Sequence, residues 1–261
     1  MRPDACHFDA GDWQAFTSLL AKRWHVDWSG YKQAQLQRRT RGFLAYEGLP
    51  SLRALAAKVA SDGALVARLH SYLTIHVTEF FRDPDFWRRL GRLLQSRPAG
   101  ELRAWSAGTA WGAEAVSLGL LCEQLNLCYT ILATDNDADT ITAARTFEYP
   151  AAVAAALPTA LRSALQPGGP GQVRLAPRIA SRITFRVHHL LRDPFPTGPF
   201  DLILCRNVLI YFEPPTRLEA IGRFTTGLAE NGILGLGATE ALLECHQFGL
   251  VNVAPSLYQK R

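Results

Sequence analysis

Apolar residues recur three and four positions apart over most of the first hundred residues, as they do in amphipathic helices. The pattern is seen in FTSLLAKRW (16–24), YKQAQLQRRTRGFLAYEG (31–48) and SLRALAAKVASDGALVARLHSYL (51–73). Gly48 and Pro50 end the second segment, and Ser51 can cap the third. We therefore expect a small helical bundle within residues 1–97, followed by the linker-like stretch QSRPAGE.

The pattern changes over residues 98–261. Short apolar runs now end in Gly, Asp, His or Asn, and helical segments lie between them: LRAWSAG, CYTILATDND, RITFRVHHL and FDLILCRNVLIYF alternate with AEAVSLGLLCEQL and ADTITAARTF. This alternation predicts an α/β fold, a Rossmann-like domain with a mostly parallel sheet.

Two later stretches predict additions to this sheet. Residues 150–177 are rich in Ala, Pro and Gly, which predicts a short helix and then a loop or small hairpin inserted into the domain. Residues 232–261 predict closing strands of the same sheet, with an antiparallel hairpin as one arrangement.

Composition and leader signals limit the class of protein. No stretch approaches the roughly 20 apolar residues of a membrane span, and MRPDACHFDAGD has neither an apolar core nor a basic leader. We therefore expect a cytoplasmic protein without a membrane span. The 5 cysteines are scattered and form no C-x-x-C pair, so reduced thiols are favoured over a zinc site or disulfides.

The net charge of +5 is unevenly distributed. Residues 1–103 hold 16 Lys and Arg against 10 Asp and Glu, whereas residues 104–261 hold 12 against 13. The basic excess therefore lies in the first part. It forms either a solvated basic face or a docking surface for an acidic partner, protein or nucleic acid.

The run WSAGTAWGAE (105–114) lies where a buried strand should give way to a helix. Its glycines would let a ligand approach the backbone closely. The spacing Gly108-x-x-x-Gly112 is not the G-x-G-x-x-G of dinucleotide sites, and the run has no basic residue for a phosphate. Asp135 follows Gly112 by 23 residues, at a strand end where an acid can bind ribose hydroxyls. These features favour S-adenosylmethionine over NAD, and a purely structural turn is the alternative.

Polar residues also follow two other predicted strands. Arg206 and Asn207 come directly after FDLILC, and His188 and His189 come after RITFRV. Ligands of parallel α/β sheets bind beyond the carboxyl ends of the strands, so these side chains are candidates for the site. An internal ion pair is the alternative for Arg206. Tyr211 can present its hydroxyl to the same crevice or pack with the next residue, and nothing at metal-ligand spacing predicts a metal site.

Arg82 lies in VTEFFRDPDFW, between aromatic residues at the junction of the two parts. A partly desolvated guanidinium requires an anionic partner. That partner is either Asp83 or Asp85 nearby, or a carboxylate of a cofactor or substrate.

Five motifs together resemble one family. They are T-x-F-F-R-D (78–83), W-S-A-G-x-x-x-G-x-E (105–114), A-T-D-x-D (133–137), C-R-N-V-L-I-Y-F (205–212) and N-G-I-L-G-L-G-x-T-E (231–240). The sequence resembles the CheR-type methyltransferases, which use S-adenosylmethionine to esterify glutamate side chains of bacterial chemoreceptors and release S-adenosylhomocysteine. The likeness runs from about Phe16 to Tyr258.

The resemblance implies a helical N-terminal domain, a Rossmann-like catalytic domain and a set of site residues. The positions that match cofactor contacts of the family are Thr78, Arg82, Glu114, Asp135, Leu190, Arg206 and Asn207. Thr78 and Arg82 would approach the methionine end and Asp135 the ribose, while Tyr211 matches a tyrosine near the transferred methyl group. Arg82 and Tyr211 are accordingly the residues expected to act in catalysis.

The sequence also departs from the family. His76 and His189 stand where asparagines usually touch the cofactor, and histidine is bulkier and titrates near neutrality. Trp111 and Ala113 are unusual in the glycine run. The insert after Pro150 is shorter than the family's β-subdomain, so tethering to a receptor peptide is not supported.

The resemblance implies a role for the basic residues of the N-terminal part. Lys32, Arg38, Arg39 and Arg41 lie on one expected helix and could guide the acidic methylation helices of a methyl-accepting chemoreceptor. We expect no nucleic-acid partner, because CRNVLIY replaces the N/D-P-P-Y/F motif of many amino methyltransferases. The alternatives are a non-catalytic or weakly active S-adenosylmethionine-binding signalling module, and a methyltransferase with another acceptor.

Overall fold

The computed structural model describes residues 8–24, 26, 28–74, 78–155 and 157–261. Its contacts group the chain into two units, Met1–Ile75 with Tyr211–Thr216, and His76–Ile210 with Arg217–Arg261. The helix α5 (Pro84–Gln95) belongs to the second unit, whereas the sequence analysis groups residues up to 97 with the N-terminal helices.

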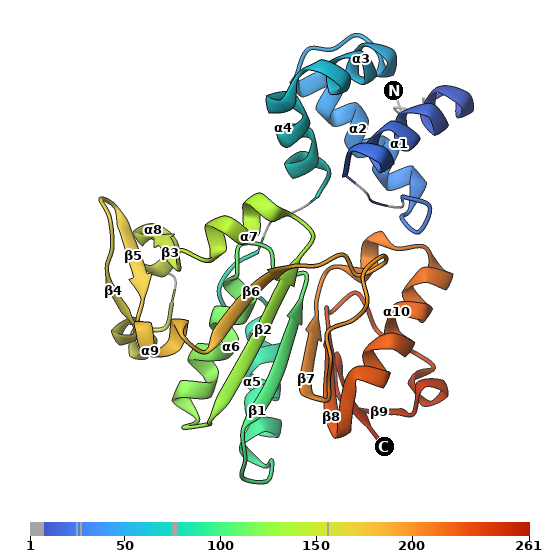
Figure 1. Cartoon of the computed structure of the whole chain (residues 1–261). Coiled ribbons are helices and arrows are strands. Elements are labelled where there is room, and N and C mark those ends of the chain that lie inside the picture. Colours follow the sequence, from blue (N-terminus) through green and yellow to red (C-terminus); the bar gives the residue numbers. More distant parts are fainter. Residues whose placement is uncertain (1–7, 25, 27, 75–77, 156) are drawn as a thin grey trace, which may run out of the picture. The chain divides into compact units, whose positions relative to one another are not determined.

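The first unit contains the helices α1 (Ala10–Trp24), α2 (Gln33–Tyr46), α3 (Leu52–Ser61) and α4 (Gly63–Leu73), drawn in blue and teal in Figure 1. Leu20, Leu55 and Leu69 are fully buried between them. The third predicted segment forms two helices, because the Asp62 carboxylate accepts from Leu65 N at 2.9 Å and starts a new one. Ser51 caps α3 through Ala54 N, as expected.

The second unit is built on a seven-stranded sheet with the order β6-β2-β1-β7-β8-β10-β9 (Figure 1). The strands are β1 (Leu102–Ala107), β2 (Tyr129–Asp135), β6 (Ile183–Val187), β7 (Phe200–Cys205), β8 (Leu228–Leu236), β9 (Leu250–Ala254) and β10 (Leu257–Lys260). The first five in sheet order are parallel, and β10 runs antiparallel to both β8 and β9. The α/β fold and its closing antiparallel hairpin are confirmed.

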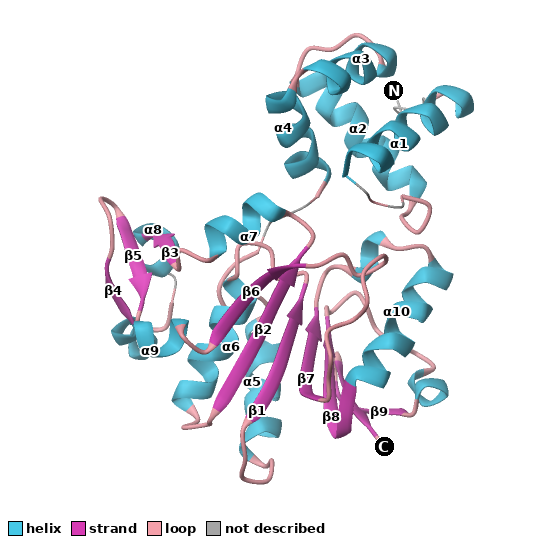
Figure 2. Ribbon diagram, in the orientation of Figure 1, coloured by secondary structure: helices cyan, strands magenta, loops and turns pink. Residues whose placement is uncertain are grey.

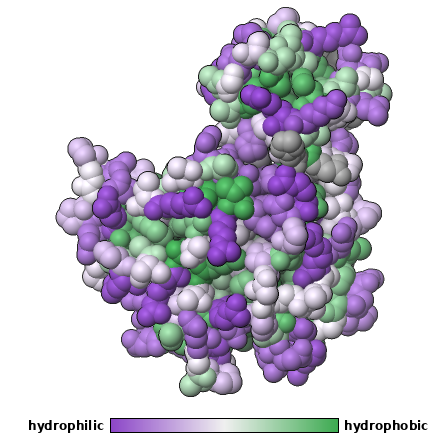
Figure 3. Space-filling model, in the orientation of Figure 1, coloured by the Kyte–Doolittle hydropathy of each residue, from purple (hydrophilic) through white to green (hydrophobic). Residues whose placement is uncertain are grey.

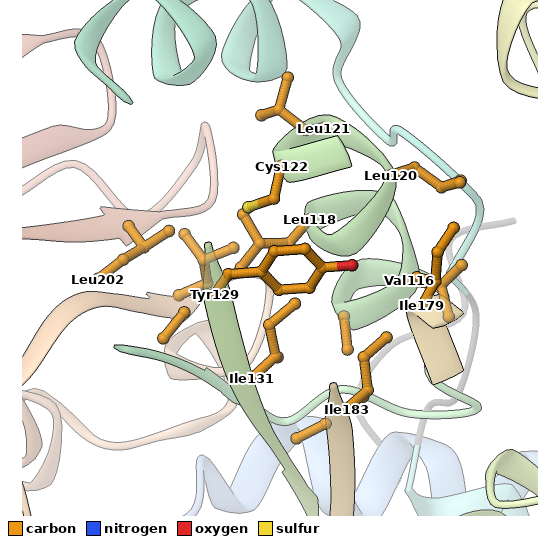
Figure 4. Close-up of a cluster of buried hydrophobic side chains, with 14 of the residues drawn as sticks. Val116, Leu118, Leu120, Leu121, Cys122, Tyr129, Ile131, Ile179, Ile183 and Leu202 are labelled. Carbon is orange, nitrogen blue, oxygen red and sulfur yellow. The ribbon is translucent and has the colours of Figure 1, made fainter. Parts of the chain in front are cut away.

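Helices cover both faces of this sheet (Figure 2), as its apolar strands require. The helices α5 and α6 (Ala113–Gln124) bury Leu90 and Leu118 against Ala104 on one face. Figure 4 shows Tyr129 at the centre of this core, where burial raises the pKa of its hydroxyl and raises that of Cys122 to about 12.

On the other face, Trp105 packs against Phe224 of α10 (Pro214–Gly227), with 5.4 Å between the ring centres. Ala104 and Trp105 are neighbours in β1, and side chains of a strand alternate between its two faces. The helix α7 (Ala138–Ala144) follows β2.

The insert forms a second sheet of three antiparallel strands, β3 (Glu148–Pro150), β5 (Gln172–Leu175) and β4 (Leu165–Pro167) in spatial order. The hairpin of β4 and β5 and the short helix α8 (Ala151–Ala155) agree with the sequence prediction, which did not include β3. Arg174 pairs with Glu148 across two of the strands. Another short helix is α9 (Pro177–Ala180), and the short 3₁₀ helices are η1 (Thr159–Ala164), η2 (Leu209–Tyr211) and η3 (Cys245–Phe248).

Hydrophilic residues cover most of the face drawn in Figure 3. Among the described residues, no helix has both the length and the apolar character needed to cross a membrane.

Candidate active site

The glycine loop connects β1 to α6, as its sequence predicts. Gly108 has φ of 80°, and a side chain there would meet Val208 Cγ2 at 2.4 Å from the new Cβ. Its N–H and that of Thr109 both donate to Thr134 O, at 2.8 and 2.9 Å. The loop is therefore held against the end of β2, and a glycine at position 108 is required by the backbone and by the neighbouring side chain.

Asp135 ends β2 and also holds this loop. Its carboxylate accepts from Ala110 N at 2.8 Å and from Asp137 N at 3.2 Å. The residue is 8% exposed. An acid fixed at the carboxyl end of the strand next to β1 is suitably placed to bind the hydroxyls of a ribose.

Arg82 lies in a turn whose backbone is strained. Phe81 and Asp83, its two neighbours, have φ of 53° and 59°, a region that non-glycine residues rarely adopt. Ser117 Oγ accepts from Phe81 N at 2.8 Å, and the Arg82 carbonyl accepts from Trp87 Nε1 at 2.9 Å. Strain of this kind persists only where surrounding contacts impose it, and such residues cluster at functional sites.

Arg206 follows β7 and is the buried cation of an ion-paired network whose acids are Glu114, also buried, and Asp83, whose side chain is 43% exposed. Its Nη2 lies 2.7 Å from Asp83 Oδ2 and 2.9 Å from the Arg82 carbonyl, and its Nη1 lies 3.5 Å from Glu114 Oε2. The guanidinium stacks on the Phe86 ring at 4.1 Å, and the side chain is 3% exposed. The internal ion pair that the sequence left as an alternative is therefore present, and it joins the turn at Arg82 to the first turn of α6.

Glu114 is the second acid of this network. Its Oε1 accepts from Ser106 Oγ at 2.7 Å. Burial raises the pKa of this carboxyl, while Arg206 and the Ser106 hydroxyl oppose the rise. Both partners therefore favour the ionised carboxylate, against the effect of its burial.

Asn207 begins the turn that links β7 to η2, and its φ is 60°. Glu240, in the loop after β8, accepts three backbone N–H groups, from Asn207 and Gly237 on Oε2, each at 2.7 Å, and from Ile210 on Oε1 at 3.0 Å. Glu240 has no exposed surface. The buried carboxylate thus joins the turn after β7 to the loop after β8.

The loop after β6 carries the other candidate residues. His188, His189 and Leu190 are buried, each 9% exposed. His189 N donates to Asp193 Oδ2 at 2.9 Å, and Arg223 of α10 donates to the carbonyls of Leu190 and Asp193, each at 2.7 Å. Its guanidinium also stacks on the Phe195 ring at 3.8 Å.

The remaining candidates are Thr78, His76 and Tyr211. Thr78 is half-buried ahead of the strained turn. His76 lies outside the described residues. Tyr211 groups with the helical unit, where its carbonyl accepts from Lys32 N at 2.9 Å and the following Phe212 packs edge-on against Tyr31.

Trp111, unusual for its loop position, takes part in a ring cluster. Phe80, Trp111 and Tyr149 lie with ring centres 5.2 to 5.6 Å apart, joining the turn before α5, the glycine loop and the start of the insert. The Tyr149 hydroxyl is buried, and burial raises its pKa. Within the part of the chain that the structure describes, no group of three or more His, Cys, Asp or Glu side chains is arranged to bind a metal ion.

Sequence reasoning did not assign Glu240, Ser106, Ser117 or Arg223 to the site. Glu240 had a detectable signal, because it follows the apolar strand of LGLGATE as Asp135 follows TILAT. Ser106, Ser117 and Arg223 form hydrogen bonds to partners between 8 and 36 residues away in the sequence, and no local pattern reveals such partners.

The family assignment comes from comparison with known proteins. Residues 76–255 match the model described as the CheR methyltransferase SAM-binding domain, and residues 11–74 match the CheR methyltransferase all-alpha domain. The chain belongs to the CheR methyltransferase family. The expected use of S-adenosylmethionine is confirmed, as is the activity of the family, which forms methyl esters on chemoreceptor glutamates.

CheR relatives match over nearly the whole chain. A chemotaxis protein methyltransferase of Listeria monocytogenes is 31% identical over 256 residues, covering 95% of this chain and 97% of the relative. The chemotaxis protein methyltransferase Cher2 of Pseudomonas putida is 30% identical over 248 residues, covering 88% and 90%. A solved TehB-like SAM-dependent methyltransferase from Corynebacterium glutamicum is 16% identical, covers 67% of this chain and 92% of that one, and has a TM-score of 0.39.

The residues present in this CheR chain fit the cofactor. Thr109 Oγ1 in the glycine loop is buried at 1% exposure without a hydrogen-bond partner, and Arg206 Nε is likewise unpaired. Buried polar atoms normally have partners, so the unpaired ones in the glycine loop and after β7 are suited to a polar ligand. Together with Asp135 they provide the acceptor and donors that a nucleoside with an amino-acid arm requires.

Proposed function

We propose that S-adenosylmethionine is bound by His76, Thr78, Arg82, Glu114, Asp135, His189, Leu190, Arg206 and Asn207, and that Arg82 and Tyr211 act where the methyl group is transferred. The observation that carries this proposal is the backbone at the candidate positions. Positive φ angles of non-glycine residues occur on both sides of Arg82, at Asn207 itself and at Ala110 in the glycine loop. The cost of these conformations, about 1–3 kcal/mol each, favours a functional reason for retaining them.

The chemistry requires little of the protein beyond placement. When bound, S-adenosylmethionine supplies an activated methyl group. A glutamate carboxylate is already ionised at neutral pH, so the acceptor needs no general base. The residues of this chain would hold the acceptor oxygen in line and exclude water.

The charged network of Arg206 is suited to such placement. Its guanidinium is fixed by Asp83, Glu114 and the Phe86 ring. A preorganised group need not reorganise during the reaction. Arg82 is half-buried in a turn that is anchored at Phe81 and Asp83, and it would orient anionic groups of substrate or cofactor.

The activity is tested by methyl transfer from labelled S-adenosylmethionine to a purified receptor, with release of the label by mild base as expected for an ester. Arg82→Ala should lower turnover about 100-fold, as expected when a positioning contact is lost. Arg88→Ala is the matched control, because Arg88 is exposed on α5 and pairs with Asp85. Full turnover by the Arg82 variant would contradict its role.

We further propose that the substrate is an acidic methylation helix guided by α2. Arg38 and Lys32 are exposed, whereas Arg39 stacks on Tyr72 and Arg41 on Phe8, each with 5.2 Å to the ring centre. Burial lowers the pKa of Arg39. Arg38 is therefore the basic residue on α2 best placed to attract an acidic helix. We propose that this helix belongs to a cytoplasmic part of a receptor protein, and not to a nucleic-acid complex, because the chain belongs to the CheR methyltransferase family.

Charge reversal tests this surface. Arg38→Glu should raise KM for the receptor several-fold at low salt and flatten its dependence on salt concentration, while turnover at saturating receptor is kept. Lys58→Glu, an equal change of charge at an exposed position of α3, is the control. Identical salt dependence of the two variants would support a merely solvated basic face.

A further inference from the structure

The buried carboxylate of Glu240 is bonded by backbone amides from two loops. Asn207 N and Gly237 N share Oε2, and Ile210 N donates to Oε1. Hydrogen bonds to an ionised acceptor are short and about twice as strong as neutral ones. The two distances of 2.7 Å, from Asn207 N and Gly237 N, agree with that description, whereas the 3.0 Å from Ile210 N is that of an ordinary hydrogen bond.

Glu240 is itself held from the other side. Arg217 of α10 donates to the carbonyls of Glu240 and Ala241, both at 2.8 Å. Tyr258 Oη accepts from Leu242 N at 2.8 Å, which fixes the loop to β10. The carboxylate therefore has little freedom to follow a movement of the turn at 207–210.

The turn that Glu240 holds cannot easily maintain its shape alone. Asn207 is in the left-handed region, and the carboxylate binds both ends of the segment from Asn207 to Ile210. The approach is so close that a Cβ on Gly237 would lie 2.5 Å from Glu240 Oε2, 2.9 Å from Asn207 N and 3.1 Å from Asn207 Nδ2. The position of the Asn207 side chain thus depends on this carboxylate.

We propose that Glu240 is a positioning residue for the cofactor site. It holds the backbone of Asn207 so that the side chains of Asn207 and Arg206 are set at the carboxyl end of β7 before S-adenosylmethionine binds. The proposal rests on the assignment of Asn207 to cofactor binding made above. Glu240 acts through Asn207 and touches neither the cofactor nor the receptor.

A double-mutant cycle on the dissociation constant of S-adenosylmethionine, measured by calorimetry on the full chain, tests the proposal. Glu240→Gln keeps the size of the side chain but replaces one acceptor oxygen by an amide that cannot accept from an N–H. Glu240→Gln and Asn207→Ala should each raise the dissociation constant at least tenfold. The double variant should be no weaker than the weaker single variant, because the Asn207 side chain is already misplaced.

Two control variants and one further variant of the same contact separate positioning from loss of stability. Leu250→Ala removes a buried side chain of β9 and should lower the melting temperature without changing cofactor affinity. Glu244→Gln changes an acid in the same loop that binds Gln247, and should leave the affinity unchanged. Gly237→Ala should weaken cofactor binding as Glu240→Gln does, because its Cβ would lie too close to both Glu240 Oε2 and Asn207 N and would separate them.

The outcomes are distinct. Multiplied effects in the double variant, or normal affinity of Glu240→Gln beside a weakened Asn207→Ala, would overturn the role of Glu240. Normal affinity of Asn207→Ala would first remove Asn207 from the cofactor site, and the proposal for Glu240 would fail with it. A cofactor affinity that falls in Leu250→Ala as far as in Glu240→Gln would show a structural effect alone.

Discussion

Two loops at the carboxyl end of the sheet are held in opposite ways. The turn after β7 is held by an acid, Glu240, which accepts its backbone N–H groups. The loop after β6 is held by a cationic side chain, that of Arg223, which donates to its backbone carbonyls. In both cases the candidate site residues lie on the loop, and the residue that holds it comes from later in the chain.

Both loops carry polar side chains on irregular backbone at the carboxyl end of the sheet. Each loop has peptide groups that regular structure does not pair, and a buried group of this kind is costly unless it is bonded. A charged side chain can satisfy several such groups at once. The loop conformation is then imposed by its neighbours, while the residues on the loop are left to bind a ligand.

The largest expected effect comes from removing the cation of the ion-paired network beside the first loop. Arg206→Met leaves Glu114 buried without its guanidinium and should lower the free energy of unfolding by about 3–5 kcal/mol. Urea unfolding measures this. Adding Glu114→Gln should recover part of the loss, because no buried charge is then left unpaired. A double variant as unstable as the sum of its singles would contradict the pairing.

A smaller effect is expected at the second loop. Arg223→Lys keeps the charge but loses the planar group that bridges two carbonyls and stacks on Phe195. Unfolding free energy should fall by about 1–2 kcal/mol, and cofactor affinity should fall several-fold. Arg192→Lys, on an exposed pair with Asp193 in the same loop, serves as the control. Equal cofactor affinities in the two variants would show that Arg223 does not position this loop.

The smallest expected effect is a pH dependence of the second loop. His188 Nε2 donates to the Pro194 carbonyl at 3.1 Å, while Nδ1 is buried without a partner. Burial lowers the pKa of His188; the bond to the Pro194 carbonyl and the charge of Asp193 oppose this shift, and Arg223 adds to it. As the pH falls, His188 is therefore protonated in the unfolded chain before it is protonated in the folded one. The contribution of the neutral His188 to the free energy of unfolding is present above about pH 6.5 and is lost as the pH falls below that value.

His188→Gln removes that proton-binding group. Its unfolding free energy should decline less than that of the wild type between pH 7 and pH 5, in urea titrations at several pH values. Parallel declines in the two proteins would assign the acid sensitivity to another group.

Much of this architecture could be predicted from the sequence. The strand ends at Asp135, His188 and Arg206 and the glycine turn at Gly108 follow from local pattern, because period, length and turn residues are local properties. The three-stranded insert was only partly predicted, since a strand as short as β3 has too few residues to show a period.

The contacts between site residues could not be predicted. Arg206 is 123 residues from Asp83, and Asn207 is 33 residues from Glu240, so their pairing depends on the completed sheet. Motifs name which residues belong to a site, whereas packing decides which of them touch. This explains why the anchoring residues Glu240 and Arg223 were not assigned to the site from the sequence.

The order of strands in the sheet bears on how the protein is made. The strand β10 leaves the ribosome after β9, yet it lies between β8 and β9 and carries Tyr258, which bonds the loop of Glu240. A nascent chain ending before residue 257 cannot complete this part of the sheet. Pairing of distant strands is slow and exposes unpaired edges until it is complete. The cofactor site should therefore be among the last parts of the protein to mature during synthesis.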